Sequence, residues 1–576
     1  PMSQPPTTPP SGPYGTDPYQ RPQSPPASGP GYPPYAAQPD YGQTQPGYGQ
    51  PGYGQAQPGY GQAPSYGQQP AYGQPGGYPP PDTSGSPGPA RSPRRSSKVP
   101  ILAAVGVVAA IALGGGAFAY SKLASTGAQP DTVIPASAVG FVRVDLDPSA
   151  GQKIAAVRFL DKLPAVKRAQ DAGGDPRESL WKSITQQDKA LSGVSYETDI
   201  KPWLGSRAAA AVLAQSTAKD KPAVMFALAV TDEAKARESL TSILAKKGVT
   251  DTDVTMKSGY AILTEKGTTS IVMAEIDKGS IATNQTYLSD ANALGDLGIA
   301  SVWVDAGAVK GASWADALAK STPSSNMNAN LDQLKGRVMA ALRFDANYLE
   351  VAGITRGAAV QLPSGATGGE VASLPADTVA AMSIAGLDAA LKDNWPALSS
   401  NFSARDIANV EDQLGITLPD DLALLLGRSF TVALPDQDWS RFSKDPRVGL
   451  KVVTTDGARA ESIIAKMLDQ AGGASSIATS RRDNTIYLAT NPSYLDSLSQ
   501  TGTLGSSETF KLAVADGQTA QSAIFVDLDK VEGNYLKDIP EANEYKSALE
   551  AIRAVGFSTR ATGPGDASFA MRLVAN

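Results

Sequence analysis

Cysteine and histidine are both absent from the 576 residues of this chain. Without a thiol, the chain has no disulfide, no thiolate nucleophile and no cysteine to carry a lipid anchor. Without an imidazole, it has no Ser-His-Asp or Cys-His catalysis and no histidine-ligated zinc. The enzyme classes that remain use carboxylate pairs, Ser-Lys or Thr nucleophiles, or a metal site built only from oxygen ligands.

The sequence also lacks a surplus of basic residues, since its formal net charge is −6. Residues 1–98 hold five basic and three acidic side chains, which leaves a net charge of −8 on the remainder. An acidic folded part repels a phosphate backbone. We therefore expect no nucleic acid among the partners.

Branched aliphatic residues are almost missing from residues 1–98, which consist mainly of Pro, Gly, Gln, Ser and Tyr. Such a segment buries too little apolar area to offset the entropy of folding, so we predict a disordered cytoplasmic tail. The triplet Tyr-Gly-Gln occurs six times between Tyr41 and Gln74. These tyrosines either promote weak self-association and docking or belong to a solvated spacer.

Charged residues are absent from Val99 to Ser121 as well. At helical rise this stretch spans about 35 Å, enough for the hydrocarbon core of a bilayer, which is about 30 Å thick. Four basic residues stand before it: Arg91, Arg94, Arg95 and Lys98. Only Lys122 follows directly, so the positive-inside rule places the N-terminus in the cytoplasm and the C-terminal part outside. We predict a single-pass cell-membrane protein with a transmembrane helix at 99–121 and a linker at 122–130.

Two features of this hydrophobic segment suggest further possibilities, cleavage of the segment and pairing of two helices. Ala117-Phe118-Ala119 fits a signal-peptide cleavage pattern, so cleavage after Ala119 competes with an uncleaved anchor; the long sequence in front of the segment favours the anchor. Gly106, Ala110 and Gly114 lie four residues apart on one helix face. They would let a second helix approach closely, which suggests a homodimer through these residues.

From residue 131 onward, several short patterns occur twice in the same order. A strand followed by an amphipathic helix with an Asp or Thr N-cap occurs at 227–244 and again at 451–468. The other matches are Asp131-Thr132-Val133 with Asp377-Thr378-Val379, Ala282–Leu288 with Ala489–Leu495, and Ser301–Asp305 with Ile524–Asp527. Asn284 and Asn491 are expected to cap the following helices, with Pro492 in the first turn. We predict two homologous repeat units at 131–356 and 372–576, joined by a linker at 357–371.

Each unit is expected to end in a hairpin, formed by 338–344 with 348–355 in the first unit and by 556–562 with 567–574 in the second. Consecutive strands and a late hairpin favour an α+β fold over a doubly wound parallel sheet. We expect mixed or antiparallel sheets with helices on one face. Apolar and polar residues alternate along Phe141–Leu146, which is typical of a half-exposed strand.

Three stretches of the exported part resemble a known family: Asp131-Thr132-Val133-Ile134-Pro135, the Ile-Lys-Pro-Trp-Leu-Gly-Ser-Arg run at 200–207, and the Ala-Thr-Asn helix starts. They look like the domain-of-unknown-function family 3352, which occurs in membrane-anchored actinobacterial proteins. The resemblance covers about 131–576 and leaves out the tail. The second unit departs from it at the Trp position, where it has Leu425-Leu426-Gly427-Arg428. The family has no assigned activity, so the resemblance implies topology and class but no functional residue.

Two pairs of carboxylates are the candidates for chemistry: Asp145 with Asp147, and Asp527 with Asp529. Residues two apart on a strand point to the same side, so a pair could hold calcium or act as acid and base. Alternatively, Asp147-Pro148 is an N-cap followed by proline at the first helical position, a structural role that we favour. Trp203 and Gly205 are expected to fill a core edge and a tight turn rather than bind a sugar.

These observations single out no catalytic, cofactor-binding or metal-ligating residue, so we favour a non-enzymatic binding or scaffold protein of the cell envelope, without a cofactor. Its exported part would bind another envelope protein, a lipid or a cell-wall polymer. One alternative is a carboxylate-dependent hydrolase of envelope glycans, which requires clustered acids in a cleft. Another is a carrier or sensor that holds an apolar ligand between sheet and helices.

Overall fold

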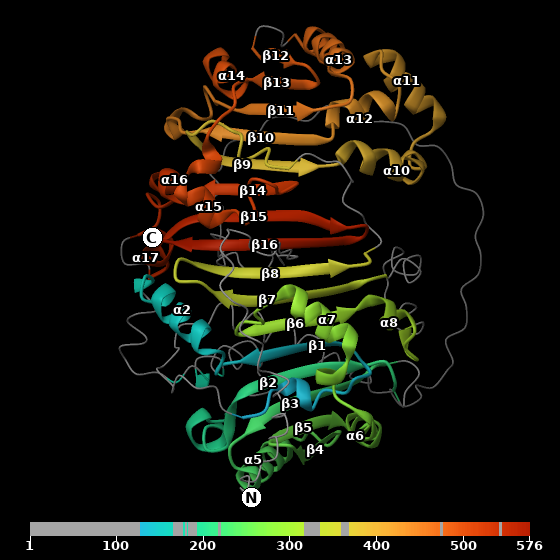
Figure 1. The fold of residues 1–576 in the computed structure, drawn as a ribbon, viewed down its shortest axis with the longest axis vertical. Coiled ribbons are helices and arrows are strands. Elements are labelled where there is room, and N and C mark those ends of the chain that lie inside the picture. The colour runs from blue at the N-terminus through green and yellow to red at the C-terminus, as the bar shows by residue number, and fades with distance from the viewer. Residues whose placement is uncertain are drawn as a thin grey trace, which may run out of the picture. The chain divides into compact units, whose positions relative to one another are not determined.

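A computed structural model of the chain describes residues 127–164, 175, 177–178, 181, 193–216, 221–315, 335–358, 368–472, 476–540 and 544–576 (Figure 1). The predicted tail (1–98) and the predicted transmembrane helix (99–121), with its cleavage pattern and dimer contact, lie outside these residues. Within the described ranges, no helix is both long enough and apolar enough to cross a membrane.

A sheet of sixteen strands organises the described part of the chain. Its strand pairs are antiparallel throughout, which confirms an α+β fold with an antiparallel sheet. The first eight strands are β1 (Ala138–Asp145), β2 (Leu204–Leu213), β3 (Ala223–Val230), β4 (Thr252–Lys257), β5 (Tyr260–Glu265), β6 (Ala300–Asp305), β7 (Arg337–Phe344) and β8 (Tyr348–Arg356). The others are β9 (Thr378–Ala385), β10 (Ser429–Pro435), β11 (Gly449–Val453), β12 (Ala478–Arg482), β13 (Thr485–Ala489), β14 (Ser522–Asp527), β15 (Ile552–Gly563) and β16 (Asp566–Ala575).

Helices connect these strands and pack on the sheet. Those before β9 are α2 (Ala150–Leu160), α5 (Glu233–Lys246), α6 (Thr269–Lys278), α7 (Gln285–Leu294) and α8 (Ala306–Lys310). Those after it are α10 (Leu387–Ser399), α11 (Ala404–Leu414), α12 (Asp420–Leu426), α13 (Gly457–Gln470), α14 (Pro492–Leu498), α15 (Glu508–Ala513), α16 (Leu528–Tyr535) and α17 (Glu544–Glu550). Short helical turns are η1 (Pro130–Thr132), η3 (Tyr196–Ile200), η4 (Ile281–Thr283), η6 (Trp439–Arg441) and η7 (Leu504–Ser506).

The strand order is the same in the two halves of the sheet. Strands β1 to β8 lie in the order β4-β5-β3-β2-β1-β6-β7-β8, and strands β9 to β16 lie in the order β12-β13-β11-β10-β9-β14-β15-β16. The pairing registers agree as well, since Phe141 of β1 pairs with Trp303 of β6 where Ala381 of β9 pairs with Phe525 of β14. The halves join where β8 pairs with β16. Each residue of β1 therefore has a corresponding position in β9.

The two predicted hairpins are confirmed as β7 with β8 and β15 with β16. The expectation of helices on one face is wrong. Tyr260 and Ile262 of β5 belong to the core that α6 and α7 cover, whereas Ala261 between them packs with Ala236 and Leu240 of α5. Neighbouring residues of a strand point to opposite faces, so helices cover both sides of the sheet here. The cause is that β5 is apolar on both faces.

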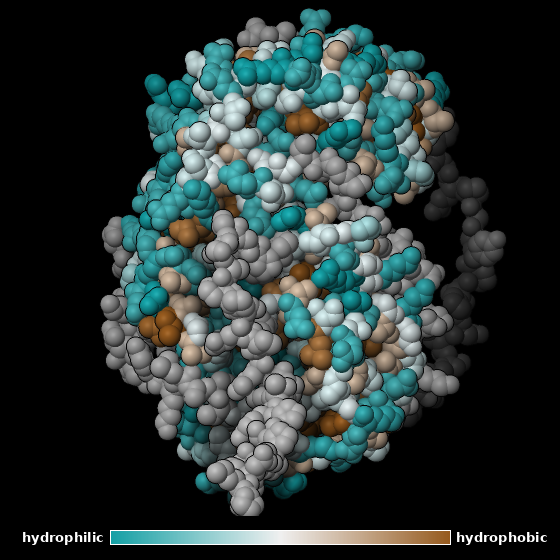
Figure 2. All heavy atoms as spheres, viewed as in Figure 1, coloured by the Kyte–Doolittle hydropathy of each residue, from teal (hydrophilic) through white to brown (hydrophobic). Residues whose placement is uncertain are grey.

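The N-terminal caps predicted for four helices are confirmed. Asp232 caps α5 and Asp456 caps α13, each by accepting a main-chain N–H of the first turn. Asn284 caps α7 and Asn491 caps α14, and Pro492 occupies the first helical position of α14. On the face seen in Figure 2, apolar residues form scattered patches among hydrophilic ones. Leu240 of α5 and Leu294 of α7 pack against strands of the sheet, so these capped helices turn apolar residues toward it.

Two of the sequence matches do not join corresponding places in the fold. Asn284 opens the second helix after β5, whereas Asn491 opens the first helix after β13. Asp131 lies in η1, well before β1, whereas Asp377 directly precedes β9. Both matches reflect the common composition of helix and strand starts, because short polar signals recur wherever a backbone needs a cap.

Candidate functional site

Polar side chains gather where β1 ends, where β2 begins and where residues 127–132 run onto the fold. We call this group the junction cluster: Gln129, Asp131, Arg143, Asp145, Asp147, Lys153 and Arg207. Each of its charged members is at most 8% exposed. Buried charges are costly unless they are paired and hydrogen-bonded. The contacts that satisfy them therefore determine what the cluster does.

Arg207 stands at the centre of the junction cluster. Its Nε donates a hydrogen bond to Asp145 Oδ1 at 3.0 Å, and its Nη2 donates to the main-chain oxygen of Asp147 at 3.0 Å. The main-chain N–H of Asp147 donates to Asp145 Oδ1 at 2.9 Å. Lys153 Nζ lies 2.5 Å from Asp147 Oδ1. Two carboxylates and two cations thus neutralise each other out of contact with solvent.

A second part of the cluster surrounds Asp131. Tyr287 donates its hydroxyl proton to Asp131 Oδ2 at 2.6 Å, and Arg143 Nη1 lies 3.7 Å from Asp131 Oδ1. Burial of the Arg143 guanidinium would by itself lower its pKa, but Asp131 and the other nearby acids raise that pKa above its ordinary value. Gln129 joins the two parts, since it accepts from Arg143 Nη1 at 3.2 Å and donates to Asp145 Oδ2 at 3.2 Å.

The cluster also holds the main chain of the residues that follow the predicted membrane segment. Arg207 Nη1 donates to the oxygen of Gly127 at 3.1 Å, and the Tyr260 hydroxyl donates to the oxygen of Ala128 at 2.7 Å. Burial raises the pKa of Tyr260, so its hydroxyl keeps the proton that it donates. Together with the contacts of the Gln129 side chain to β1, these donors fix three consecutive residues to β1, β2 and β5.

The second half of the sheet has no such charges at the corresponding positions. Arg143 corresponds to Ser383, and the paired residues Asp145 and Arg207 correspond to the paired residues Ala385 and Ser429. Ser383 Oγ lies 3.2 Å from Ser429 Oγ, and both side chains are buried. The fold therefore forms with small neutral residues at these positions. The charged set occurs at the one place where residues 127–131 enter.

The structure brings the predicted carboxylates Asp145 and Asp147 to one partner, Arg207. The capping role predicted for Asp147 is wrong, because α2 begins at Ala150 and its N-cap is Ser149, whose hydroxyl accepts from the main-chain N–H of Gln152 at 3.4 Å. Buried carboxylates that are already paired with cations are poorly suited to exchange protons with a substrate. The pair is thus better suited to holding structure than to catalysis.

The second predicted pair shares no hydrogen-bond partner among the described residues. Asp527 ends β14 at the N-cap position of α16, and its burial raises its pKa. Asp529 accepts from Asn576 Nδ2 at 3.1 Å and lies 3.9 Å from Arg553 Nε. In the part of the chain that the structure describes, no group of three acidic side chains is arranged to hold a metal ion.

Trp203 lies in the interior, as predicted, with 1% of its surface exposed and its Nε1 donating to the oxygen of Asp199 at 2.6 Å. The turn predicted at Gly205 is wrong, since this residue belongs to β2. A Cβ placed at Gly205 would lie 2.8 Å from Cβ of Ala229 on β3. Glycine is needed here for the close approach of two strands.

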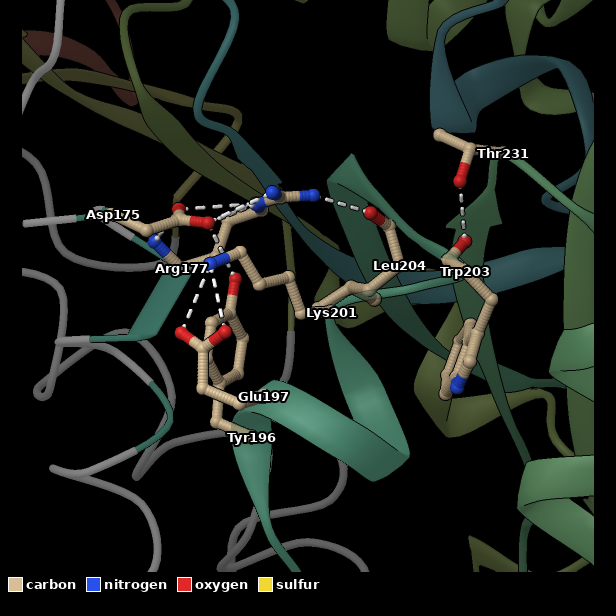
Figure 3. A network of polar contacts seen from close by, with 8 residues as sticks. All are labelled: Asp175, Arg177, Tyr196, Glu197, Lys201, Trp203, Leu204 and Thr231. Carbon is tan, nitrogen blue, oxygen red and sulfur yellow. Dashed lines mark hydrogen bonds and ion pairs between the residues drawn. The ribbon is translucent and has the colours of Figure 1, made fainter.

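Beside Trp203 lies a polar network that sequence reasoning missed (Figure 3). Arg177 Nη2 donates to Asp175 Oδ2 at 2.8 Å, and Arg177 Nη1 donates to the oxygen of Leu204 at 2.5 Å. The Tyr196 hydroxyl donates to Asp175 Oδ2 at 2.7 Å. Burial alone would raise the pKa of Asp175, but the hydrogen bonds from Arg177 and Tyr196 outweigh it and hold this pKa below its ordinary value. The network attaches Asp175 and Arg177 to the start of β2.

Acid is therefore expected to weaken this attachment. Because the folded-state pKa of Asp175 is depressed, its contribution to stability is present above the unfolded pKa of about 3.9 and is lost as the pH falls through the lower folded value. Thermal melting measured from neutral to acidic pH should show a smaller acid-induced loss for Asp175→Asn than for the unchanged chain. The exposed control Asp161→Asn should behave like the unchanged chain, and equal behaviour of both variants would contradict the assignment.

A signal for the junction cluster was present in the sequence. Phe141, Arg143 and Asp145 alternate with apolar residues, and all three are buried on one side of β1, so the half-exposed strand predicted there is wrong. Charged residues in step with the aromatic Phe141 indicate charges on the buried face of β1, whereas their partner Arg207, inside β2, is supplied by the fold. Gln129 gave no such signal, since its partners are fixed only by the fold.

A family model described as "Protein of unknown function (DUF3352)" matches residues 101–484, about two thirds of the chain. The match begins inside the hydrophobic segment rather than at residue 131, and it ends between β12 and β13 rather than at residue 576. No curated protein matches the chain. No solved structure matches it either.

Proposed function

This chain belongs to the DUF3352 family of proteins of unknown function, and we propose that it is a single-pass, membrane-anchored protein of the cell envelope. Its N-terminal tail lies in the cytoplasm, residues 99–121 span the membrane, and the folded part lies outside, where it binds or scaffolds another envelope component. That component is a protein, a lipid or a cell-wall polymer. Close approach of two anchors through Gly106, Ala110 and Gly114 would add a homodimer.

The observation that carries this proposal is the junction cluster. Arg207 of the cluster holds Gly127, Arg143 holds Gln129, and the neighbouring Tyr260 holds Ala128. Only five residues, 122–126, separate this segment from the hydrophobic segment. The corresponding positions of the second half are neutral, so the charges are not a requirement of the fold. These contacts let the folded part be held and positioned through its N-terminal end.

A binding or scaffold role is favoured over hydrolysis because of the state of the carboxylates. A glycan hydrolase of this kind needs one protonated and one ionised carboxylic group open to the substrate. Asp145 and Asp147 are buried and paired with Arg207 and Lys153. The equal strand orders of the two halves support a further proposal, that the folded part consists of two homologous units at 131–356 and 372–576.

Cysteine mapping tests the topology, since the chain has no cysteine of its own. Two single variants of the full chain, Ser3→Cys in the tail and Glu238→Cys on α5, are treated in intact cells with a maleimide that cannot cross membranes. We expect the α5 variant to react and the tail variant to react only after the membrane is opened. In each variant, the tail and the folded part should remain on one uncleaved chain, and this chain should stay in the membrane fraction after alkaline extraction. Reaction of both in intact cells, or recovery of the folded part without the tail, would refute the proposal.

A further inference from the structure

We propose that residues 127–132 form a releasable strap, and that closing of the strap onto Arg143, Asp145 and Arg207 of the junction cluster holds the folded part near the membrane. This inference rests on the anchor proposed above. The strap is the segment from Gly127 to Thr132, which includes η1. Its open state lengthens the tether between the membrane and the sheet without unfolding the sheet.

The first support is a change in how the chain is held. Gly127 and Ala128 are exposed residues, and they are attached by hydrogen bonds to their main-chain oxygens. Val133 and Ile134, directly after the strap, are fully buried in the apolar core. The main-chain oxygen of Ile134 also accepts from Ile281 at 2.8 Å. The strap is thus held by polar contacts, which water can replace. Val133 and Ile134, which we call the plug, are held by apolar burial. Opening therefore stops at Val133.

The second support is incomplete pairing at the Asp131 end of the strap. Asp131 Oδ1 and Arg143 Nε are both buried, and neither has a hydrogen-bond partner among the described residues. Arg143 Nη1 and Asp131 Oδ1 are 3.7 Å apart, which is longer than a hydrogen bond. Buried polar atoms without partners disfavour the closed state, because release would hydrate them. These two atoms therefore favour opening at the Asp131 end of the strap.

The consequence is a change in reach. With the strap closed, residues 122–126 alone separate the predicted membrane helix from the fold, and five extended residues span at most about 18 Å. With the strap open, residues 122–132 are free, and eleven extended residues span at most about 40 Å. The folded part can then meet partners about 20 Å farther from the bilayer. The junction cluster thus sets how far from the membrane the folded part acts.

Cysteine labelling of the full chain in lipid vesicles tests the strap. Pro130→Cys places a thiol in the strap at a buried position, and Val133→Cys places one in the plug behind it. We expect maleimide to label the first variant faster than the second under native conditions. Adding Gln129→Ala removes two hydrogen bonds of the closed strap, which should speed labelling of Pro130→Cys by about tenfold and leave Val133→Cys unchanged. Equal labelling rates in both positions, with or without Gln129→Ala, would overturn the proposal.

The reach is tested by energy transfer between a dye on Glu238→Cys and acceptor dyes on the lipid headgroups. Gln129→Ala should lower the transfer efficiency, whereas Arg459→Ser, which breaks a partly buried contact to Asp421 in the second half, should not. Unchanged transfer in Gln129→Ala would overturn the strap's role in reach. If the unchanged chain fails to stay with the vesicles, the anchor proposed above is wrong, while the labelling rates still report on the strap.

Discussion

Replacing Arg207 by serine is expected to lower the free energy of unfolding by about 3–5 kcal/mol, because it leaves Asp145 buried without its cation. Asp147 keeps Lys153 as a partner, but the main-chain oxygens of Gly127 and Asp147 lose their donor. Urea denaturation of the purified full chain, followed by tryptophan fluorescence, measures the change. The loss should be among the largest for any single substitution in the sheet, since an unpaired buried charge costs more than a lost apolar contact.

The second half of the sheet supplies a matched control for this change. The double variant Asp145→Ala with Arg207→Ser places at this pair the residues found at its corresponding pair, Ala385 and Ser429. It removes both charges together, so we expect it to be more stable than Arg207→Ser alone. A double variant that is less stable than the single one would show that the Asp145 carboxylate stabilises the fold without Arg207.

Replacing Glu350 by leucine is expected to have an effect of similar size, about 3–5 kcal/mol. Arg343 Nε donates to one carboxylate oxygen of Glu350 at 2.5 Å, and Arg572 Nε donates to the other at 2.8 Å. All three side chains are buried, and leucine would leave two guanidinium groups without their shared counter-charge. Glu350 lies on β8 between Arg343 on β7 and Arg572 on β16, so the same carboxylate also ties the two halves of the sheet together.

Calorimetry measures this second role. Without this tie, the two halves should unfold separately. We therefore expect two unfolding transitions for Glu350→Leu and one for the unchanged chain. Ser568→Ala serves as the control, because Ser568 is fully buried on β16 but forms only a 3.3 Å hydrogen bond to the oxygen of Arg560. We expect it to cost about 1 kcal/mol and to leave the shape of the transition unchanged. An unchanged melting profile for Glu350→Leu would refute the tie.

The fold was predictable where a local signal determines a local structure. Asp232 and Asn284 cap their helices because a short polar side chain meets free N–H groups, and this requires no knowledge of distant residues. The hairpins followed from adjacent strand patterns. Placement of helices on both faces was not predictable in this way, since α5 and α6 follow neighbouring strands but pack on opposite sides.

The site was less predictable, because its partners are far apart in the sequence. Asp145 was identified as a candidate, but its cation, Arg207, comes from another strand. Spacing cannot reveal such a pair, and alternation along β1 suggested exposure instead. Gln129 was assigned to a linker, and its contacts with Arg143 and Asp145 appear only once β1 is folded.

The two outermost strands of the sheet, β4 and β12, have a consequence for crowding. A free strand edge is a template for pairing with another molecule, and proteins held on a membrane surface meet each other often. β4 carries Asp253 and Lys257, and β12 ends with Arg481 and Arg482. Charges on edge strands oppose growth of a sheet from one molecule to the next. In the anchored state proposed above, these charges would keep the sheets of neighbouring copies from joining into a fibre.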